Sequence, residues 1–235
     1  MAVGHVQNWT GVASTTGTGT ITGTAVTAGN WMVAATRVGT GQTVTPPSPF
    51  TSVLSIDNSP GGTTVLEVFI GKAVGGETSF AFTETGTSMR VVLTEFSSIL
   101  ADSPLNVSAL AETTSNTTCV TGTTGASAQA DSMAIAFLAT SGGSITAPSC
   151  SYQLDGSTTA PAFTLGAEAT VGAIGLLLAW RVLSAIGTHA GTWSWTTARP
   201  TGSAIIVLKG LAPGGGGGGG VNGSAQWTEQ ERRRR

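Results

Sequence analysis

A period of two runs through almost the whole chain, and this pattern constrains the fold more than any other feature. In TGTGTITGTAVT, residues 16–27, threonine occupies every even position from 16 to 24, and the odd positions from 17 to 25 are Gly, Gly, Ile, Gly and Ala. Alternate residues of a strand point to opposite faces, so this run predicts a strand with a threonine comb on one face. The other face is nearly bare and lets another backbone approach closely. A low-complexity N-terminal arm would also give this pattern.

Further β-rich runs follow, most of them separated by Gly, Pro, Ser, Asn or Asp. They cover residues 31–38, 53–56, 64–72, 78–83, 90–96, 133–139, 171–183, 192–196 and 204–209. A helix competes with a strand only at 171–183. This spacing predicts an all-β fold, a jelly-roll-like antiparallel β-sandwich of about eight principal strands.

An internal echo divides the β-rich region into two halves. NWMVAATRVGTGQTVTPPSPF, from Asn30, resembles DSMAIAFLATSGGSITAPSCSY, from Asp131. The echo continues downstream, where Lys72 matches Arg181. Each half would supply about four strands and could not bury both its faces alone, so pairing the halves predicts one sandwich. Shared Gly/Thr-rich composition alone could also produce this likeness.

The chain is predicted to have three parts. Residues 1–27 form a Gly/Thr-rich N-terminal arm and first strand, and residues 28–211 form the sandwich, with halves at about 28–100 and 131–211. Residues 212–235 form a flexible linker with seven consecutive glycines and a short charged peptide. The candidate partner-binding residues of this tail are Trp227, Arg232, Arg233, Arg234 and Arg235.

Charge is scarce, and its distribution excludes one class of partner. Only 9% of the 235 residues are charged, and the net charge is −2. Without the four C-terminal arginines, six basic residues remain against twelve acidic ones, so the body carries −6. A mildly acidic body offers no positive groove for a phosphate backbone, so nucleic-acid binding by the folded part is not expected.

The sequence also indicates where the protein is made. MAVGHVQNWTG has neither the basic nor the apolar region of a secretory signal. The longest apolar run, residues 169–180, is shorter than the roughly 20 residues that span a bilayer. We therefore expect synthesis in a cytosol and no membrane insertion.

Residues that could carry chemistry are few. Cys119 and Cys150 lack zinc-site spacing, and a mutual disulfide is one alternative for them. His5 lies near a loose N-terminus, and His189 is predicted to be an exposed turn residue. No nucleophile-elbow, zinc-protease or phosphate-loop motif is present. We therefore predict no catalytic residue, no metal site and no cofactor.

The acidic residues are scattered singly, which does not favour a glycosidase pair. Glu67 and Glu95 interrupt apolar β patterns, where such an acid faces solvent, lies at a subunit contact or pairs with a base such as Lys72 or Arg90. The DNSPG sequence at residues 57–61 is interpreted as a plain turn, with a calcium contact as its alternative.

Two tryptophans form a candidate recognition surface on the folded body. Trp193 and Trp195 flank Ser194, so both rings project from the same face of a strand. The core is the favoured location, because they echo Phe80 and Phe82. The alternative is a platform on which a glycan or protein partner stacks.

At this point the pattern resembles a known family. The Gly turn followed by TPPSPF, the FAF strand at residues 80–82, the strand ending EFSS at residues 95–98 and the closing AIIVLKG are similar to small jelly-roll proteins of tailed-bacteriophage virions. These include minor tail proteins and head-decoration proteins, and the likeness spans about residues 28–210. The motifs are mostly turn and aromatic placements, and the resemblance supplies no catalytic residue.

The resemblance implies a non-enzymatic structural protein of the virion, with a minor tail or tail-tip role ahead of head decoration. Its expected partners are other virion proteins and further copies of itself, because a charge-poor surface suits closely packed subunit contacts. The alternative is a carbohydrate-binding module that recognises a host-surface glycan during adsorption.

Overall fold

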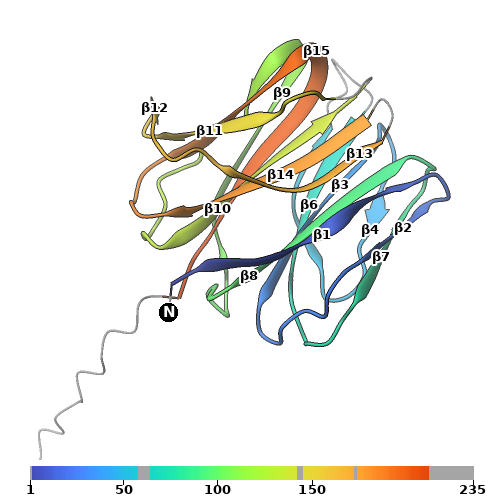
Figure 1. Cartoon of the computed structure of the whole chain (residues 1–235), viewed down its shortest axis with the longest axis horizontal. Coiled ribbons are helices and arrows are strands. Elements are labelled where there is room, and N and C mark those ends of the chain that lie inside the picture. Colours follow the sequence, from blue (N-terminus) through green and yellow to red (C-terminus); the bar gives the residue numbers. More distant parts are fainter. Residues whose placement is uncertain (1, 58–63, 142–144, 172–173, 212–235) are drawn as a thin grey trace, which may run out of the picture.

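The computed structural model describes residues 2–57, 64–141, 145–171 and 174–211 (Figure 1). These residues form antiparallel strands and no helix, so the predicted all-β sandwich is confirmed. No helix in these ranges could cross a membrane. The strands outnumber the eight predicted, because each half of the chain builds a sandwich of its own.

The first half of the described chain forms two sheets. Five strands pair in the order β1-β8-β3-β6-β5, and three pair in the order β2-β7-β4. The strands are β1 (Gly4–Ser14), β2 (Thr18–Thr22), β3 (Trp31–Gly39), β4 (Val44–Thr45), β5 (Thr51–Asp57), β6 (Thr64–Lys72), β7 (Ser79–Glu84) and β8 (Met89–Ser97).

The second half forms one strongly curled sheet. Its path is β12-β11-β15-β10-β14-β13, and β9 also pairs with β15. The strands are β9 (Leu105–Val120), β10 (Ser132–Thr140), β11 (Ser149–Leu154), β12 (Ser157–Thr158), β13 (Thr164–Val171), β14 (Ile174–Leu183) and β15 (His189–Leu208).

The two halves have the same pairing order once the long strands are divided. Residues 201–208 of β15 pair with β10 and with the start of β9, as β8 pairs with β3 and β1. Residues 189–194 of β15 pair with β11, and residues 192–194 pair with the end of β9, as β7 pairs with β4 and β2. Each half is therefore a jelly-roll-like sandwich, and in the second half β9 and β15 continue through the corner at which the first half breaks into separate strands.

Three apolar cores hold these layers together. The central core lies between the five-stranded sheet and β10, β14 and β15, and includes Val33, Val68, Phe137 and Ile206. The first outer core lies inside the first half and the second outer core inside the second half. The large sheet of each half is thus buried on both faces.

The echo places its aromatic pairs in equivalent positions. Phe80 and Phe82 of β7 fill the first outer core, and Trp193 and Trp195 of β15 fill the second. The matched methionines do not correspond: Met32 of β3 faces the first outer core, whereas Met133 of β10 faces the central core. The echo is therefore one residue out of phase there, because a shift of one residue turns a side chain to the opposite face.

The threonine alternation is confirmed in β2. Thr18, Thr20 and Thr22 are exposed, whereas Gly19 and Ile21 are buried. A Cβ on Gly19 would lie 3.0 Å from atoms of Met89 and of Val91, so the bare face does admit a close neighbour. Residues 174–183 form a strand, not the alternative helix.

Candidate functional site

A cluster of buried hydrogen bonds surrounds His189 at the start of β15. His189 is fully buried, which corrects the prediction of an exposed turn residue. Its Nδ1 lies 2.7 Å from the Tyr152 hydroxyl and its Nε2 lies 2.9 Å from Ser127 Oγ. A neutral imidazole, with one donor and one acceptor nitrogen, satisfies both contacts.

The segment that follows β9 encloses this histidine with hydroxyl groups spaced three residues apart. The backbone N–H groups of Thr121, Thr124 and Ser127 donate to the carbonyl oxygens of Gly191, His189 and Gly187, each at 2.9 Å. In return, the N–H groups of Gly191 and His189 donate to the Thr121 and Thr124 hydroxyls. The segment therefore covers the edge of β15 without forming a regular strand.

Charged groups flank the cluster on its outer side. The Arg181 guanidinium lies 3.8 Å from the centre of the Tyr152 ring and donates to the carbonyl oxygens of Thr159 and Pro161. Asp155 accepts from the Thr188 N–H at 2.8 Å and from its hydroxyl at 3.1 Å. These bonds lower the pKa of Asp155. Burial lowers the pKa of His189, opposed by Asp155 and assisted by Arg181.

A serine beside a histidine is the geometry of an activated nucleophile, but here the serine is inaccessible. Ser127, Tyr152 and His189 are exposed by 3%, 2% and 0%. A substrate could not reach the serine without opening the segment that covers it. The arrangement therefore acts as a buried hydrogen-bond network that fixes the segment to β15.

This network predicts a dependence of stability on pH. Because the pKa of His189 is lower in the folded state than its unfolded value of about 6.5, its contribution is complete above that value and is lost as the pH falls below it. The limiting slope for one proton is about 1.4 kcal/mol per pH unit. We expect denaturant unfolding of the protein at pH 7 and pH 5 to show this loss.

The matched variant is His189→Gln, which cannot be protonated. Burial raises the pKa of Glu84, which gives a pH dependence of opposite sign, but Glu84 contributes equally to both proteins and cancels in their difference. Parallel pH profiles for the parent and the variant would contradict the role assigned to His189.

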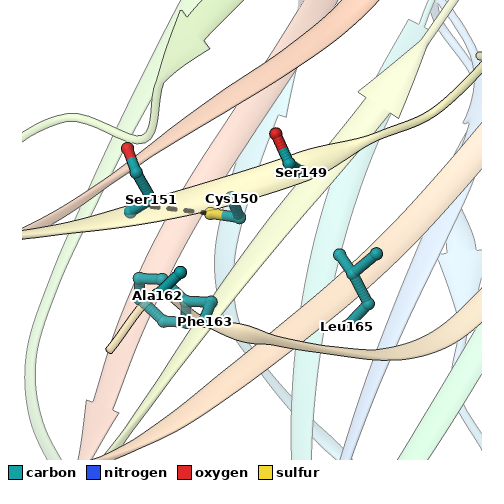
Figure 2. Close-up of a pocket in the computed structure, with 6 residues that line it drawn as sticks. All are labelled: Ser149, Cys150, Ser151, Ala162, Phe163 and Leu165. Atoms are coloured by element: carbon teal, nitrogen blue, oxygen red, sulfur yellow. Dashed lines mark hydrogen bonds between the residues drawn. The ribbon is translucent and has the colours of Figure 1, made fainter. Parts of the chain in front are cut away.

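A shallow pocket of about 310 Å³ adjoins the second outer core (Figure 2). Figure 2 shows it between β11, with Ser149, Cys150 and Ser151, and the segment carrying Ala162, Phe163 and Leu165. Burial raises the pKa of the Cys150 thiol, so the thiolate needed for nucleophilic attack or metal binding is disfavoured. The pocket offers an apolar depression and no charged group.

The candidate disulfide is not formed, since both cysteines are free. Trp193 pairs in register with Cys119 of β9 on one side and with Cys150 of β11 on the other. The two Cα atoms are therefore two strand spacings apart, about 10 Å, whereas a disulfide needs less than about 7 Å. The Cys119 sulfur instead lies 3.1 Å from Ser203 Oγ.

The two candidate glycan-stacking rings are core residues. Trp193 is 0% exposed and Trp195 is 5% exposed. Both belong to the second outer core, which is the location that their echo of the phenylalanine pair favoured. Neither ring has a free face for a sugar in this structure.

Glu95 pairs with neither of the bases suggested for it. This carboxylate is fully buried, and it accepts from Gln7 Nε2 at 2.6 Å, Asn30 Nδ2 at 2.6 Å and the Thr27 N–H at 2.9 Å. It therefore joins β1 and the connection between β2 and β3 to the sheet. Lys72 is exposed at the end of β6.

Removing this acceptor should destabilise the protein. Glu95→Ala leaves three donors without their partner, and we expect a loss of about 2–3 kcal/mol in the free energy of unfolding. Glu95→Gln keeps one oxygen acceptor and should lose clearly less. Equal losses for the two variants in urea titrations would show that the donors do not depend on the acceptor.

Arg90 lies instead beside Arg37, its register partner on β3. Both are buried, and Glu84 is the acid that acts on both. Burial and the Arg90 charge, opposed by Glu84, lower the pKa of Arg37 to about 10. Glu67 is half-buried on β6 between Thr36 and Ser55 of the neighbouring strands.

Other candidate residues are dispersed or lie outside the described ranges. His5 belongs to β1, not to a loose terminus, and its ring stacks on Trp180 of β14 at 4.6 Å. Residues 58–61 of the candidate calcium turn, and the tail residues Trp227 and 232–235, lie outside the described ranges. Among the described residues, no group of three His, Cys, Asp or Glu side chains could hold a metal ion.

Comparison with known proteins gave no match to a protein-family model, to a curated protein or to a solved structure.

Proposed function

We propose that this chain is a non-enzymatic structural protein of a tailed-bacteriophage virion, a minor tail or tail-tip component. The observation that carries the proposal is the fold of two packed jelly rolls, whose chemistry-bearing side chains at His189 and Glu95 are engaged in internal hydrogen bonds. This use of polar groups suits a protein that serves by shape and contact. Head decoration of the capsid is the runner-up location.

The surface offers ways to assemble. Two strands pair with a neighbouring strand of the sheet on one side: β9 pairs with β15, and β13, the last strand of the sheet, pairs with β14. Leu110 and Val120 of β9 are exposed by 45% and 42%, and Leu165 of β13 by 47%. Apolar strand edges of this kind form contacts with neighbouring subunits. The partners would be further copies of this chain and other virion proteins.

Carbohydrate recognition, the second candidate function, depended on two tryptophan rings being exposed at the surface. Its candidate rings, Trp193 and Trp195, lie in the second outer core. Host attachment through a glycan would need a different surface.

The test has two parts. Light scattering of the full chain and of residues 1–211 should give the same discrete oligomer, which would locate assembly in the β-sandwich. Particles purified from cells that carry the gene should contain the protein at a fixed copy number by quantitative mass spectrometry. Its absence from purified particles would overturn the proposal. A copy number matching the capsid lattice would favour head decoration instead.

A further inference from the structure

The contact between the two halves is reciprocal. β1 of the first half lies against β13, and β9, which takes the place of β1 in the second half, lies against β5, the counterpart of β13. The contact of β8 with β14 is matched by that of β15 with β6. The contact of β3 with β14 is matched by that of β10 with β6. These reciprocal contacts are those expected of two halves related by an approximate twofold axis through the central core.

The two faces that meet at this axis have the same chemistry. Each contributes branched aliphatic, aromatic and alanine side chains that are almost fully buried. The first half supplies Val33, Ala35, Leu66, Val68 and Val92, and the second supplies Ile135, Phe137, Ala139, Leu178 and Ile206. A face that packs against its own counterpart across a twofold axis is the signature of a symmetric homodimer.

The first and last residues of both halves also lie close together, at one corner of the molecule. Lys209, after β15, accepts from the Leu100 N–H at 2.8 Å and donates its own N–H to the Pro104 carbonyl at 2.7 Å. A Cβ on Gly210 would lie 3.4 Å from Val3 Cβ. Figure 1 places the N-terminus beside the end of β15. The end of each half therefore lies beside the start of the other.

We infer that the chain is an internal duplication of one jelly-roll module, and that the central face of each module is a docking surface for a second copy of such a module. The contact within the chain is then a homodimer contact made covalent through residues 98–104. Strand pairing and packing carry this inference, and it is independent of the virion role.

The first experiment reverses the order of the modules. A permuted chain runs from residue 102 to 211, through a short Gly/Ser linker, and then from residue 2 to 101. The control permutant opens at Gly41, an exposed turn within the first module where an added Cβ would meet no atom within 4 Å. We expect the reversed chain to melt within about 4 °C of the parent and the control to melt more than about 8 °C lower. The opposite ranking would overturn the inference.

The second experiment tests the docking face. A recognition sequence for a specific protease is inserted between Ala101 and Asp102, which are exposed. After cleavage of the folded protein, the two pieces should stay together at the parent mass by light scattering. Separation without denaturant would contradict the docking surface.

Discussion

Replacing Trp193 by alanine is expected to lower the free energy of unfolding by about 3–5 kcal/mol, the range for truncating a large aromatic side chain in a packed core. The indole is fully buried in the second outer core. Its neighbours in register, Cys119 and Cys150, have short side chains that cannot fill the space it would leave. The cavity would open where β9, β15 and β11 meet.

Urea denaturation followed by circular dichroism measures this loss. Val182→Ala is the control, because Val182 is 40% exposed and its truncation should change stability by less than about 0.5 kcal/mol. A Trp193→Ala protein as stable as the parent would mean that the ring is not a core residue. The glycan-stacking alternative would then need to be tested directly.

A single methyl group at Gly11 is expected to cost about 3 kcal/mol. Gly11 lies in β1 where it crosses β13, and a Cβ there would collide with the carbonyl group of Glu168 and would lie 2.8 Å from Ala169 Cβ. The obstacle is mainly backbone, so relief requires the two strands to move apart. Gly11→Ala thus weakens the contact between the halves without removing any group.

Gly4→Ala is the matched control in the same strand. A Cβ at Gly4 would meet one atom, the Ser97 hydroxyl oxygen, at an ordinary 3.4 Å. Thermal unfolding of the two variants should separate them by several degrees. If both melt together, the crossing of β1 over β13 does not limit the packing of the halves.

The strands that could be predicted from the sequence are those with dense apolar content. β3, β6, β8, β10 and β14 are rich in apolar residues on both faces, because these central strands are covered on both sides. β9 could not be recognised, since LNVSALAETTSNTTCV lies at a sheet edge with one face largely exposed. In β1 and β13, register shifts interrupt the alternation of side chains.

The buried cluster around His189 could not be predicted from the sequence, for a different reason. Its partners Thr121, Thr124 and Ser127 recur every third residue, in a segment that forms neither a strand nor a helix. The motif TGTTGAS therefore looks like a loop, and a histidine in GTHAG looks like a turn. The sequence signal for the duplication was visible, but a shift of one residue between Met32 and Met133 concealed how the faces correspond.

The central core has a consequence for synthesis on the ribosome. The first half is complete at Ser97, yet the strand that finishes the opposing sheet ends at Leu208. Translation proceeds at about 5–20 residues per second, so the apolar face with Val33, Leu66 and Val68 stays uncovered for roughly 6–20 s after the first half is made. During that interval its best available match is the same face of another nascent chain. Chains made on neighbouring ribosomes of one messenger RNA would therefore tend to form dimers in which the first half of one chain packs against the first half of the other. Slower elongation would increase the yield of these dimers.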